Sequence, residues 1–212
     1  MPFYQRIEVD DNTALFVWKI TESYNDLFRE VSLKDTSLAR LEGMKSESHQ
    51  KGFLAVRMLL QYNGYSDFDL YYDEFGKPHL NDGVNISISH SFGFSVIILS
   101  NKNIGIDLEL RRDLVKKIAY KFAEEKFVYE YENNSSEFIS MLTVIWGIKE
   151  AVFKVRNEIG ISFKDHIFVR PFQMNEKKTT ALLDFNALKS EFLVYFTEIE
   201  NYTLVWLWET ES

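Results

Sequence analysis

Two acidic residues stand within an apolar stretch, IGIDLEL, near the middle of this 212-residue chain. Because strand side chains alternate between two faces, Asp107 and Glu109 would share one face, with Cα atoms about 6–7 Å apart. At an effective dielectric near 20, two such charges repel by roughly 2–3 kcal/mol. Water on an open face, a basic partner or a divalent cation would offset that repulsion. The simplest alternative is a half-exposed strand whose outer face is acidic without carrying chemistry.

A second group of this kind lies in WGIKEAVFK, in the second half of the chain. Glu150 and Lys154 are four residues apart, so on a helix they would share a face. As a solvent-exposed ion pair they would contribute only about 0.3–0.5 kcal/mol. Their neighbours on that face are Trp146, Gly147 and Phe153, which do not suit a solvated surface, and a glycine within a helix costs about 1 kcal/mol relative to alanine. The pattern therefore predicts a partly buried site with an acid and a base, where another group approaches Gly147 closely.

Hydrophobic periodicity indicates the elements that must hold these side chains. The two acids would lie on a strand over residues 104–110, and the second group on a helix from Phe138 to about Asn157. That helix has one apolar stripe, made of Phe138, Leu142, Ile145, Ile148, Val152 and Val155. Further strands are predicted in ALFVWKI, NISISHS and FSVIILS, and after the long helix in HIFVRPF, TTALLDF, EFLVYFTEI and NYTLVWLWE.

The first half carries a helical region of its own, from Thr36 to about Gln61, with Gly43 as a candidate break. Strands, a long helix and further strands thus occur in each half of the chain. This repetition predicts the α+β class, with two similar lobes over residues 1–102 and 103–212 that form a pseudo-dimer. Turn residues also predict a turn at ENNSSE, residues 132–137.

Composition excludes several classes of function. The chain is 46% hydrophobic, 26% charged and 16% aromatic, which is enough to build a core without covalent staples. It has no cysteine, and therefore no disulfide, thiolate metal site or cysteine nucleophile. A net charge of −8 argues against a general nucleic-acid binder, although a local basic cluster can still bind a small anion. The N-terminus shows no signal-peptide pattern and no apolar run approaches the roughly 18 residues of a membrane span, so a cytoplasmic protein that does not enter a membrane is expected.

Four short motifs, in this order, resemble the 4′-phosphopantetheinyl transferases in their larger, two-lobed, single-chain form. They are GKP, ISHS, GIDLE and WGIKEAVFK, and the matching stretch runs from about Arg40 to Lys154. The combination of GIDLE with a later W..KE...K pattern is specific, whereas each motif alone would be weak. The chain departs from the commonest form at Gly147, because a small polar residue usually follows the tryptophan. The last part of the chain matches the family only in its strand-like character.

The resemblance implies an enzyme that moves the phosphopantetheine arm of coenzyme A onto a serine of an apo acyl or peptidyl carrier protein and releases 3′,5′-ADP. It places the active site between two α+β lobes, with coenzyme A contacts from the first lobe and the metal site and catalytic helix from the second. Asp107, Glu109 and Glu150 would bind Mg²⁺, which needs only one or two carboxylates besides phosphate oxygens. Glu150 or a metal-bound water would take the serine proton. Lys154 would neutralise charge on the phosphate under attack and on the departing product.

The same resemblance assigns coenzyme A contacts to residues of the first lobe. Lys77 of GKP and His90 of ISHS match pyrophosphate contacts, with Ser89 beside them, and Arg40 matches an early basic residue that often binds the adenosine 3′-phosphate. Each of the first two has a simpler interpretation, Lys77 as a solvated turn lysine and His90 as a structural histidine. Other basic residues close to Arg40 are Lys45, His49 and Lys51. Structural contacts alone are expected for Arg57, His79 and His166.

The stretch RRDLVKKIAYKF, residues 111–122, predicts a helix with one apolar and one basic face. The basic residues are Arg111, Arg112, Lys116, Lys117 and Lys121. Charged residues usually form solvated surface. Carrier proteins are commonly acidic, however, and an acidic enzyme needs a local positive patch to receive one. This face is therefore a candidate docking surface for the carrier protein. Two lobes in one chain would make a monomer sufficient, and the identity of the carrier stays open.

Two other classes of function were weighed against the transferase. A catalytically silent relative could hold coenzyme A or a carrier protein, but a pure binder has no need of a base beside the metal ligands. A different magnesium enzyme acting on phosphoesters could use the same acids, but GKP and ISHS argue against it. The transferase is the leading hypothesis because it uses all four motifs.

Overall fold

A computed structural model of the chain describes residues 3–124 and 135–210, and over these residues it combines antiparallel sheets with helices. The chain divides into two compact units, Met1–Lys102 and Asn103–Ser212. This mixed architecture agrees with the predicted α+β class. That the two units form a pseudo-dimer with a shared site stays a prediction.

The first unit is built on a four-stranded antiparallel sheet with the strand order β1-β2-β6-β5. Its strands are β1 (Phe3–Asp10), β2 (Thr13–Lys19), β5 (Asn85–Ser91) and β6 (Phe94–Ser100). The strands predicted in ALFVWKI, NISISHS and FSVIILS are confirmed. The sequence did not predict β1, because this edge strand is largely exposed and lacks apolar alternation. A separate hairpin holds the GKP turn and consists of β3 (Leu70–Tyr72) and β4 (Pro78–Leu80).

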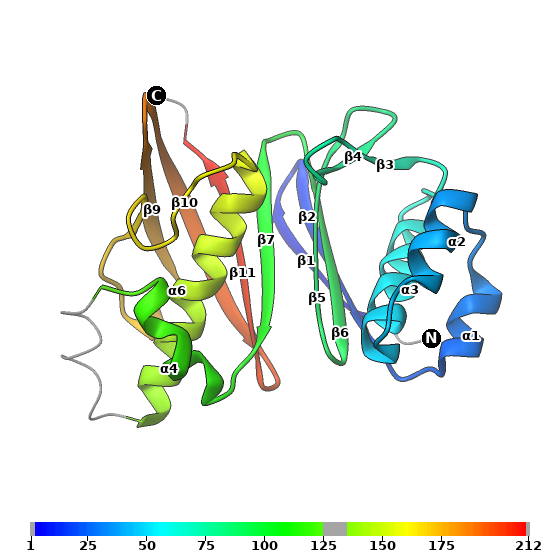
Figure 1. The fold of residues 1–212 in the computed structure, drawn as a ribbon, viewed down its shortest axis with the longest axis horizontal. Coiled ribbons are helices and arrows are strands. Elements are labelled where there is room, and N and C mark those ends of the chain that lie inside the picture. Colours follow the sequence, from blue (N-terminus) through cyan, green and yellow to red (C-terminus); the bar gives the residue numbers. More distant parts are fainter. Residues whose placement is uncertain (1–2, 125–134, 211–212) are drawn as a thin grey trace. The chain divides into compact units, whose positions relative to one another are not determined.

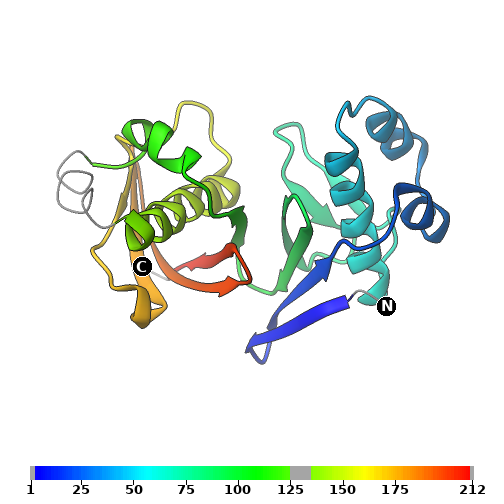
Figure 2. The same cartoon turned by 90° about the horizontal axis from the view of Figure 1, so that it is seen from below.

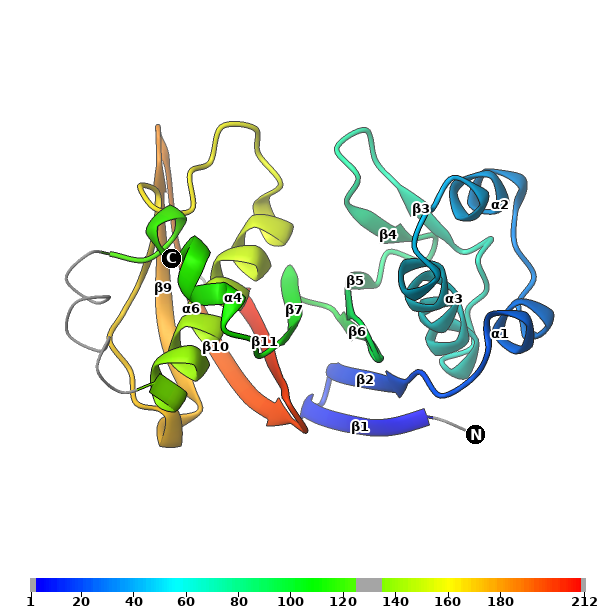
Figure 3. The same ribbon diagram turned by 60° about the horizontal axis from the view of Figure 1, so that its bottom comes forward.

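Three helices complete the first unit: α1 (Tyr24–Glu30), α2 (Asp35–Glu42) and α3 (Glu47–Tyr62). Helix α3 packs on β2, β5 and β6, and α1 packs on α3 (Figure 3). The apolar residues Phe53, Val56, Leu59 and Leu60 of α3 recur at helical spacing, and all four are buried. Gly43 follows the end of α2, so the predicted break between the two helices is confirmed.

The second unit is built on a five-stranded antiparallel sheet with the strand order β7-β11-β10-β9-β8. Its strands are β7 (Ile104–Leu110), β8 (Ile167–Val169), β9 (Lys178–Phe185), β10 (Leu188–Ile199) and β11 (Tyr202–Glu209). All five lie where the sequence predicted strands. Asp107 on β7 pairs with Val205 on β11, so the last strand of the chain supports the strand that carries the acids.

A long helix, α6 (Ser135–Arg156), lies along one face of this sheet against β7 and β11 (Figure 1). Its whole predicted apolar stripe is buried: Phe138, Leu142, Ile145, Ile148, Val152 and Val155. The turn predicted at residues 132–137 begins outside the described residues. No helix among the residues that the structure describes is long and apolar enough to cross a membrane.

A shorter helix, α4 (Leu114–Ile118), packs on α6, which lies between α4 and the sheet in Figure 2. The chain continues as a 3₁₀ turn, η1 (Ala119–Lys121). The helix predicted over residues 111–122 is therefore too long. The tighter turn at η1 brings Phe122 into the core, where it is fully buried. A second 3₁₀ turn, η2 (Met174–Glu176), precedes β9.

Two glycines let α6 lie unusually close to the sheet. A Cβ atom at Gly105 on β7 would overlap the carbonyl oxygen of Ala151 on α6. A Cβ atom at Gly147 on α6 would lie 2.9 Å from Cγ2 of Val205 on β11. Because protein interiors are close-packed, neither position has room for a larger residue without movement of the helix. The close approach predicted at Gly147 is thus confirmed.

Candidate functional site

The predicted acidic strand and the predicted acid–base helix meet in the second unit. Lys154 Nζ on α6 lies 2.7 Å from Asp107 Oδ1 on β7 and donates a second hydrogen bond to the Ile106 carbonyl at 2.9 Å. Further along the same contact, Trp146 Nε1 donates to Glu109 Oε1 at 3.1 Å. Asp107 and Glu109 therefore share the face of β7 that α6 covers, as strand alternation predicted.

Asp107 is 4% exposed, which rules out the simple interpretation of these acids as the outer face of a half-exposed strand. The strand is buried on its other face as well, where Ile106 and Leu108 are 0% and 1% exposed. Of the three partners considered for the paired acids, the structure provides the basic one, Lys154. Lys154 thus pairs with Asp107 on the strand, and it is not simply the partner of Glu150 in a solvent-exposed pair on the helix.

The electrostatics of the site raise the proton affinity of two of its acids. Burial, followed by the negative charge of Asp107, raises the pKa of Glu109 to about 7. The hydrogen bond from Trp146 opposes this rise. Burial, again followed by the charge of Asp107, raises the pKa of Glu150 to about 7, and the charge of Lys154 partly offsets that rise. The single ammonium group of Lys154 is thus not enough to keep all three neighbouring carboxylates fully ionised at neutral pH.

The donor set suits a hard divalent cation. Among the described residues, no three His, Asp or Glu side chains already converge as a metal centre. Mg²⁺ does not require such a cage, because one or two carboxylates, water and substrate phosphates usually complete its octahedral shell. Asp107, Glu109 and Glu150 offer only carboxylate oxygens, and the raised pKa values of the two glutamates show that additional positive charge would stabilise their ionised forms.

The residues assigned to coenzyme A lie in the first unit, two of them near the first half of α3. The guanidinium of Arg40 lies 4.9 Å from the ring centre of Tyr72 and 6.0 Å from that of Phe53 on α3. His90 on β5 lies against Gly52 of α3, the residue before Phe53. A Cβ atom at Gly52 would be 3.0 Å from the imidazole ring of His90. Arg40 and His90 are exposed, so both side chains can meet a ligand.

Lys77 and Ser89 differ from them in exposure. Lys77 is half-buried in the turn before β4, where its backbone N–H donates to Asp73 Oδ1 at 2.9 Å. Asp73 also receives the backbone N–H of Phe75, so this turn has a defined shape. Ser89 is 7% exposed on β5, next to His90. Ser89 is therefore less accessible to a ligand than the exposed His90 beside it.

Three residues expected to be structural do make structural contacts. Arg57 Nε lies 2.9 Å from Asp67 Oδ1, and both side chains are buried. His79 Nε2 lies 3.1 Å from Asp73 Oδ2 in the β3–β4 hairpin. His166 Nδ1 accepts the backbone N–H of Ser162 at 2.8 Å.

The candidate docking surface is partly used inside the protein. Arg111 pairs with Glu198 and donates to the Glu200 carbonyl at 2.8 Å, so it belongs to the strand junction rather than to a free basic face. The exposed lysines of the surface are accompanied by exposed apolar side chains, Leu114 at 49% and Tyr120 at 64%. A small cavity of about 60 Å³ lies beside this helix and reaches one of the acids. It is lined by Glu109, Leu110, Arg112, Leu114, Val115, Ile118, Thr143 and Trp146.

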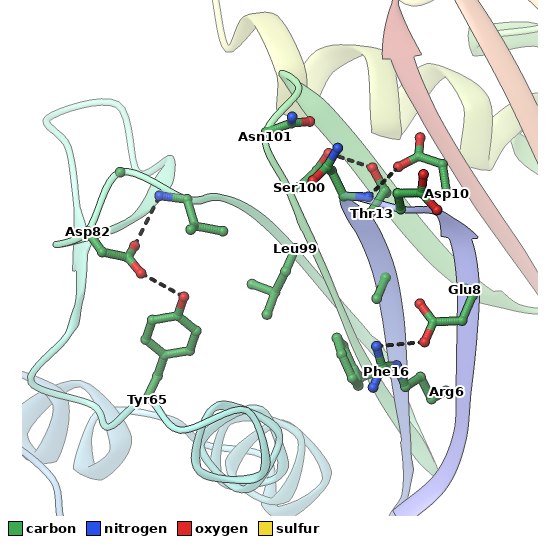
Figure 4. A pocket seen from close by; sticks show the side chains of 15 residues that line it. Arg6, Glu8, Asp10, Thr13, Phe16, Tyr65, Asp82, Leu99, Ser100 and Asn101 are labelled. Atoms are coloured by element: carbon green, nitrogen blue, oxygen red, sulfur yellow. Dashed lines mark hydrogen bonds and ion pairs between the residues drawn. The ribbon is translucent and has the colours of Figure 1, made fainter.

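An open groove of about 540 Å³ in the first unit contains none of the predicted site residues. Several of its polar groups are paired with one another (Figure 4). Tyr65 donates to Asp82 at 2.8 Å, and Arg6 lies 2.6 Å from Glu8. We assign it no role in the chemistry.

Two contacts of the site were missed by the sequence interpretation. Trp146 was treated as an apolar neighbour, yet its indole N–H binds Glu109. Lys149 was part of the quoted motif without a role, yet it is 3% exposed and binds two backbone carbonyls. The available signal was its spacing, four residues after Ile145 and three before Val152 of the apolar stripe, which places this lysine on the buried face, where it needs hydrogen-bond partners.

No protein-family model matches the chain. A curated 4′-phosphopantetheinyl transferase, gsp, from Aneurinibacillus migulanus is 27% identical over 128 residues. The match covers 60% of this chain and 52% of that protein, so the chain spans about half the length of the curated relative that it matches. This similarity supports the superfamily that the motifs suggested, while the two-lobed subtype stays a prediction.

Proposed function

We propose that this protein transfers the 4′-phosphopantetheine arm of coenzyme A to a serine of an apo acyl or peptidyl carrier protein in a Mg²⁺-dependent reaction. One observation carries the proposal: Asp107, Glu109, Glu150 and Lys154 form one cluster between β7 and α6, in which two carboxylates have pKa values of about 7. The similarity to a relative that bears the name of this activity supports it.

Glu150 has the properties of the base in this proposal. A serine hydroxyl is a weak nucleophile unless a base removes its proton in the transition state. An ionised carboxylate can accept that proton, and the neighbouring charge of Lys154 favours the ionised form of Glu150. The serine oxygen would form a bond to the phosphorus next to the pantetheine arm, and the bond from that phosphorus to the bridging oxygen would break. The proton passes to Glu150, and 3′,5′-ADP leaves with the electron pair.

Lys154 and the strand acids stabilise charge in the same scheme. The ammonium of Lys154 offsets negative charge that develops on the departing phosphate. Asp107, Glu109 and Glu150 would hold Mg²⁺, which supplies Lewis-acid polarisation and orientation of the pyrophosphate when bound. The basic residues Arg40, Lys77 and His90, with Ser89, would bind the anionic groups of coenzyme A.

The carrier protein would dock on α4 and η1. We assign the contact to Arg112, Lys116, Lys117 and Lys121, whose charges complement an acidic partner. The exposed Leu114 and Tyr120 add apolar area beside these cations. Of these side chains, the aromatic Tyr120 and the arginine Arg112 are of the types enriched at protein–protein interfaces.

A mass spectrum of an apo carrier protein tests the proposal. The protein is incubated with coenzyme A and Mg²⁺, with an apo fatty-acid carrier in one sample and an apo peptide-synthetase carrier domain in another. A gain of one phosphopantetheine arm that a chelator prevents is the expected result. No gain on either carrier would contradict the transferase. Tight coenzyme A binding without transfer would then indicate the catalytically silent alternative, and no binding would refute the family assignment.

A further inference from the structure

Lys149 is a buried lysine that the proposed reaction does not use. It lies on α6, one residue before Glu150, and is 3% exposed. Its Nζ donates to the Phe163 carbonyl at 2.5 Å and to the Ile167 carbonyl. Burial lowers its pKa to about 8. A charged group in such a place is retained only with good hydrogen-bond partners, and the two carbonyls supply them.

These two contacts fix the segment that follows α6. Beyond the helix the backbone turns at Asn157, with φ of 50°, and at Gly160, with φ of 95°. It then returns to the sheet as β8, which begins at Ile167. Because Lys149 binds both Phe163 and the first residue of β8, one ammonium group determines where the returning chain crosses the helix.

The Phe163 ring consequently lies on the side of α6 that carries Trp146. Its centre is 5.5 Å from that of Trp146 and 5.8 Å from that of Phe153. Trp146, Lys149 and Phe153 are spaced by three and four residues, so they form one stripe along α6. The Trp146 indole also meets the Phe122 ring, edge to face, at 5.1 Å. Two aromatic neighbours thus limit its rotation.

We infer that Lys149 is a positioning residue for the acidic cluster. Its ammonium holds Phe163 in place, the Phe163 ring holds the Trp146 indole, and the indole N–H orients Glu109 at 3.1 Å. Any effect on catalysis rests on the proposed function, but the contacts themselves are measurable in the folded protein without substrate.

The first test is an NMR measurement on Lys149→Met, which removes the ammonium and keeps a long apolar side chain. The Trp146 indole N–H resonance is assigned with Trp146→Phe. In Lys149→Met this resonance should shift or broaden and its hydrogen exchange should accelerate about tenfold. The Trp18 resonance, in the other unit, should not move. An unchanged Trp146 resonance in a folded Lys149→Met protein would overturn the inference.

Val194→Ala is the matched control, because Val194 is a fully buried residue of the same core on β10. It should lower the melting temperature, as we also expect for Lys149→Met, while the Trp146 resonance stays in place. If both variants change the Trp146 resonance equally, Lys149 contributes only general stability and the inference fails.

Phe163→Ala tests the contact between the Phe163 ring and the Trp146 indole, and it does not depend on whether Lys149→Met folds. It keeps the carbonyl that Lys149 binds and removes the ring, so it should reproduce the change at Trp146. The double variant should add little beyond either single change, because residues acting in series are not additive. A Trp146 resonance that does not respond to Phe163→Ala would overturn the route through the ring.

Activity provides a second measurement that separates this inference from the proposed function. In Lys149→Met, kcat should fall about tenfold while KM for coenzyme A stays within about twofold, since the assigned coenzyme A contacts are untouched. Equal changes in both constants would contradict a positioning role. A wild-type protein without transferase activity would refute the proposed function, and the expected NMR changes would still support the contacts.

Discussion

Two ion pairs with a buried carboxylate, one in each unit, use charge in different ways. In the first unit, Arg57 and Asp67 lie 2.9 Å apart with side chains 3% and 0% exposed. Asp67 also accepts hydrogen bonds from the backbone N–H of Lys34 and the hydroxyl of Ser37, each at 3.0 Å. Donors therefore surround this carboxylate, and one guanidinium balances its charge, although Nη2 of Arg57 is itself buried without a hydrogen-bond partner among the described residues.

In the second unit, Lys154 and Asp107 lie 2.7 Å apart with side chains 29% and 5% exposed. Their neighbours are Glu109 and Glu150, both with pKa values raised to about 7. The cluster around this pair has three carboxylates for one ammonium, and that ammonium, Lys154, is partly accessible to solvent. The comparison teaches that a site is recognised by an incomplete charge balance rather than by burial alone.

Removing Asp107 should have the largest effect on activity. Asp107 pairs with Lys154, and its charge raises the pKa values of both glutamates. Without this carboxylate, in Asp107→Ala, transfer should fall by about 10³-fold or more at any practical Mg²⁺ concentration. The measurement is kcat/KM with an apo carrier protein. The melting temperature should change little, because the like-charge repulsion is relieved. Full activity in this variant would show that the acids are only part of the strand.

The matched change in the first unit should do the opposite. Asp67→Ala leaves Arg57 buried without its counter-charge and should lower the free energy of unfolding by about 3–5 kcal/mol. Chemical denaturation measures the loss. The kcat of the remaining folded fraction should be unchanged, and a selective loss of kcat would place Asp67 in the site.

The pH dependence of stability should also distinguish the two pairs. A carboxyl whose pKa is higher in the folded state binds more protons when folded, so its contribution to stability falls as pH rises from about 4.5 to 7. The slope is at most about 1.4 kcal/mol per pH unit for each group. Denaturation of wild type and of the Glu109→Gln/Glu150→Gln variant at several pH values measures it, and the variant should show a flatter profile. Identical profiles would mean that the glutamates titrate normally.

Exposed charges on the docking surface should have the smallest effect. Lys116→Glu/Lys117→Glu should raise KM for an acidic carrier protein about three- to tenfold and leave KM for coenzyme A nearly unchanged. Lys178→Glu/Lys189→Glu, on exposed positions of β9 and β10, is the control and should change neither constant. Equal effects of the α4 variant on both constants would remove the docking role.

The sequence predicted the helices and strands of the site better than the contacts between their side chains. The apolar stripe of α6 and the shared face of Asp107 and Glu109 follow from periodicities of 3.6 and 2 residues, which the local chain obeys. The helix over residues 111–122 was predicted too long, because the chain after Ile118 forms a 3₁₀ turn before the buried Phe122. A local pattern does not contain that choice.

The sequence alone therefore determined which of the proposed site residues share a face. Only the tertiary structure decided that α6 covers the acidic face, that Lys154 binds Asp107, and that Trp146 binds Glu109. The physical reason is the contact between elements far apart in the chain. Gly105 and Gly147 permit the helix to lie against β7 and β11, and the burial that results raises the two glutamate pKa values.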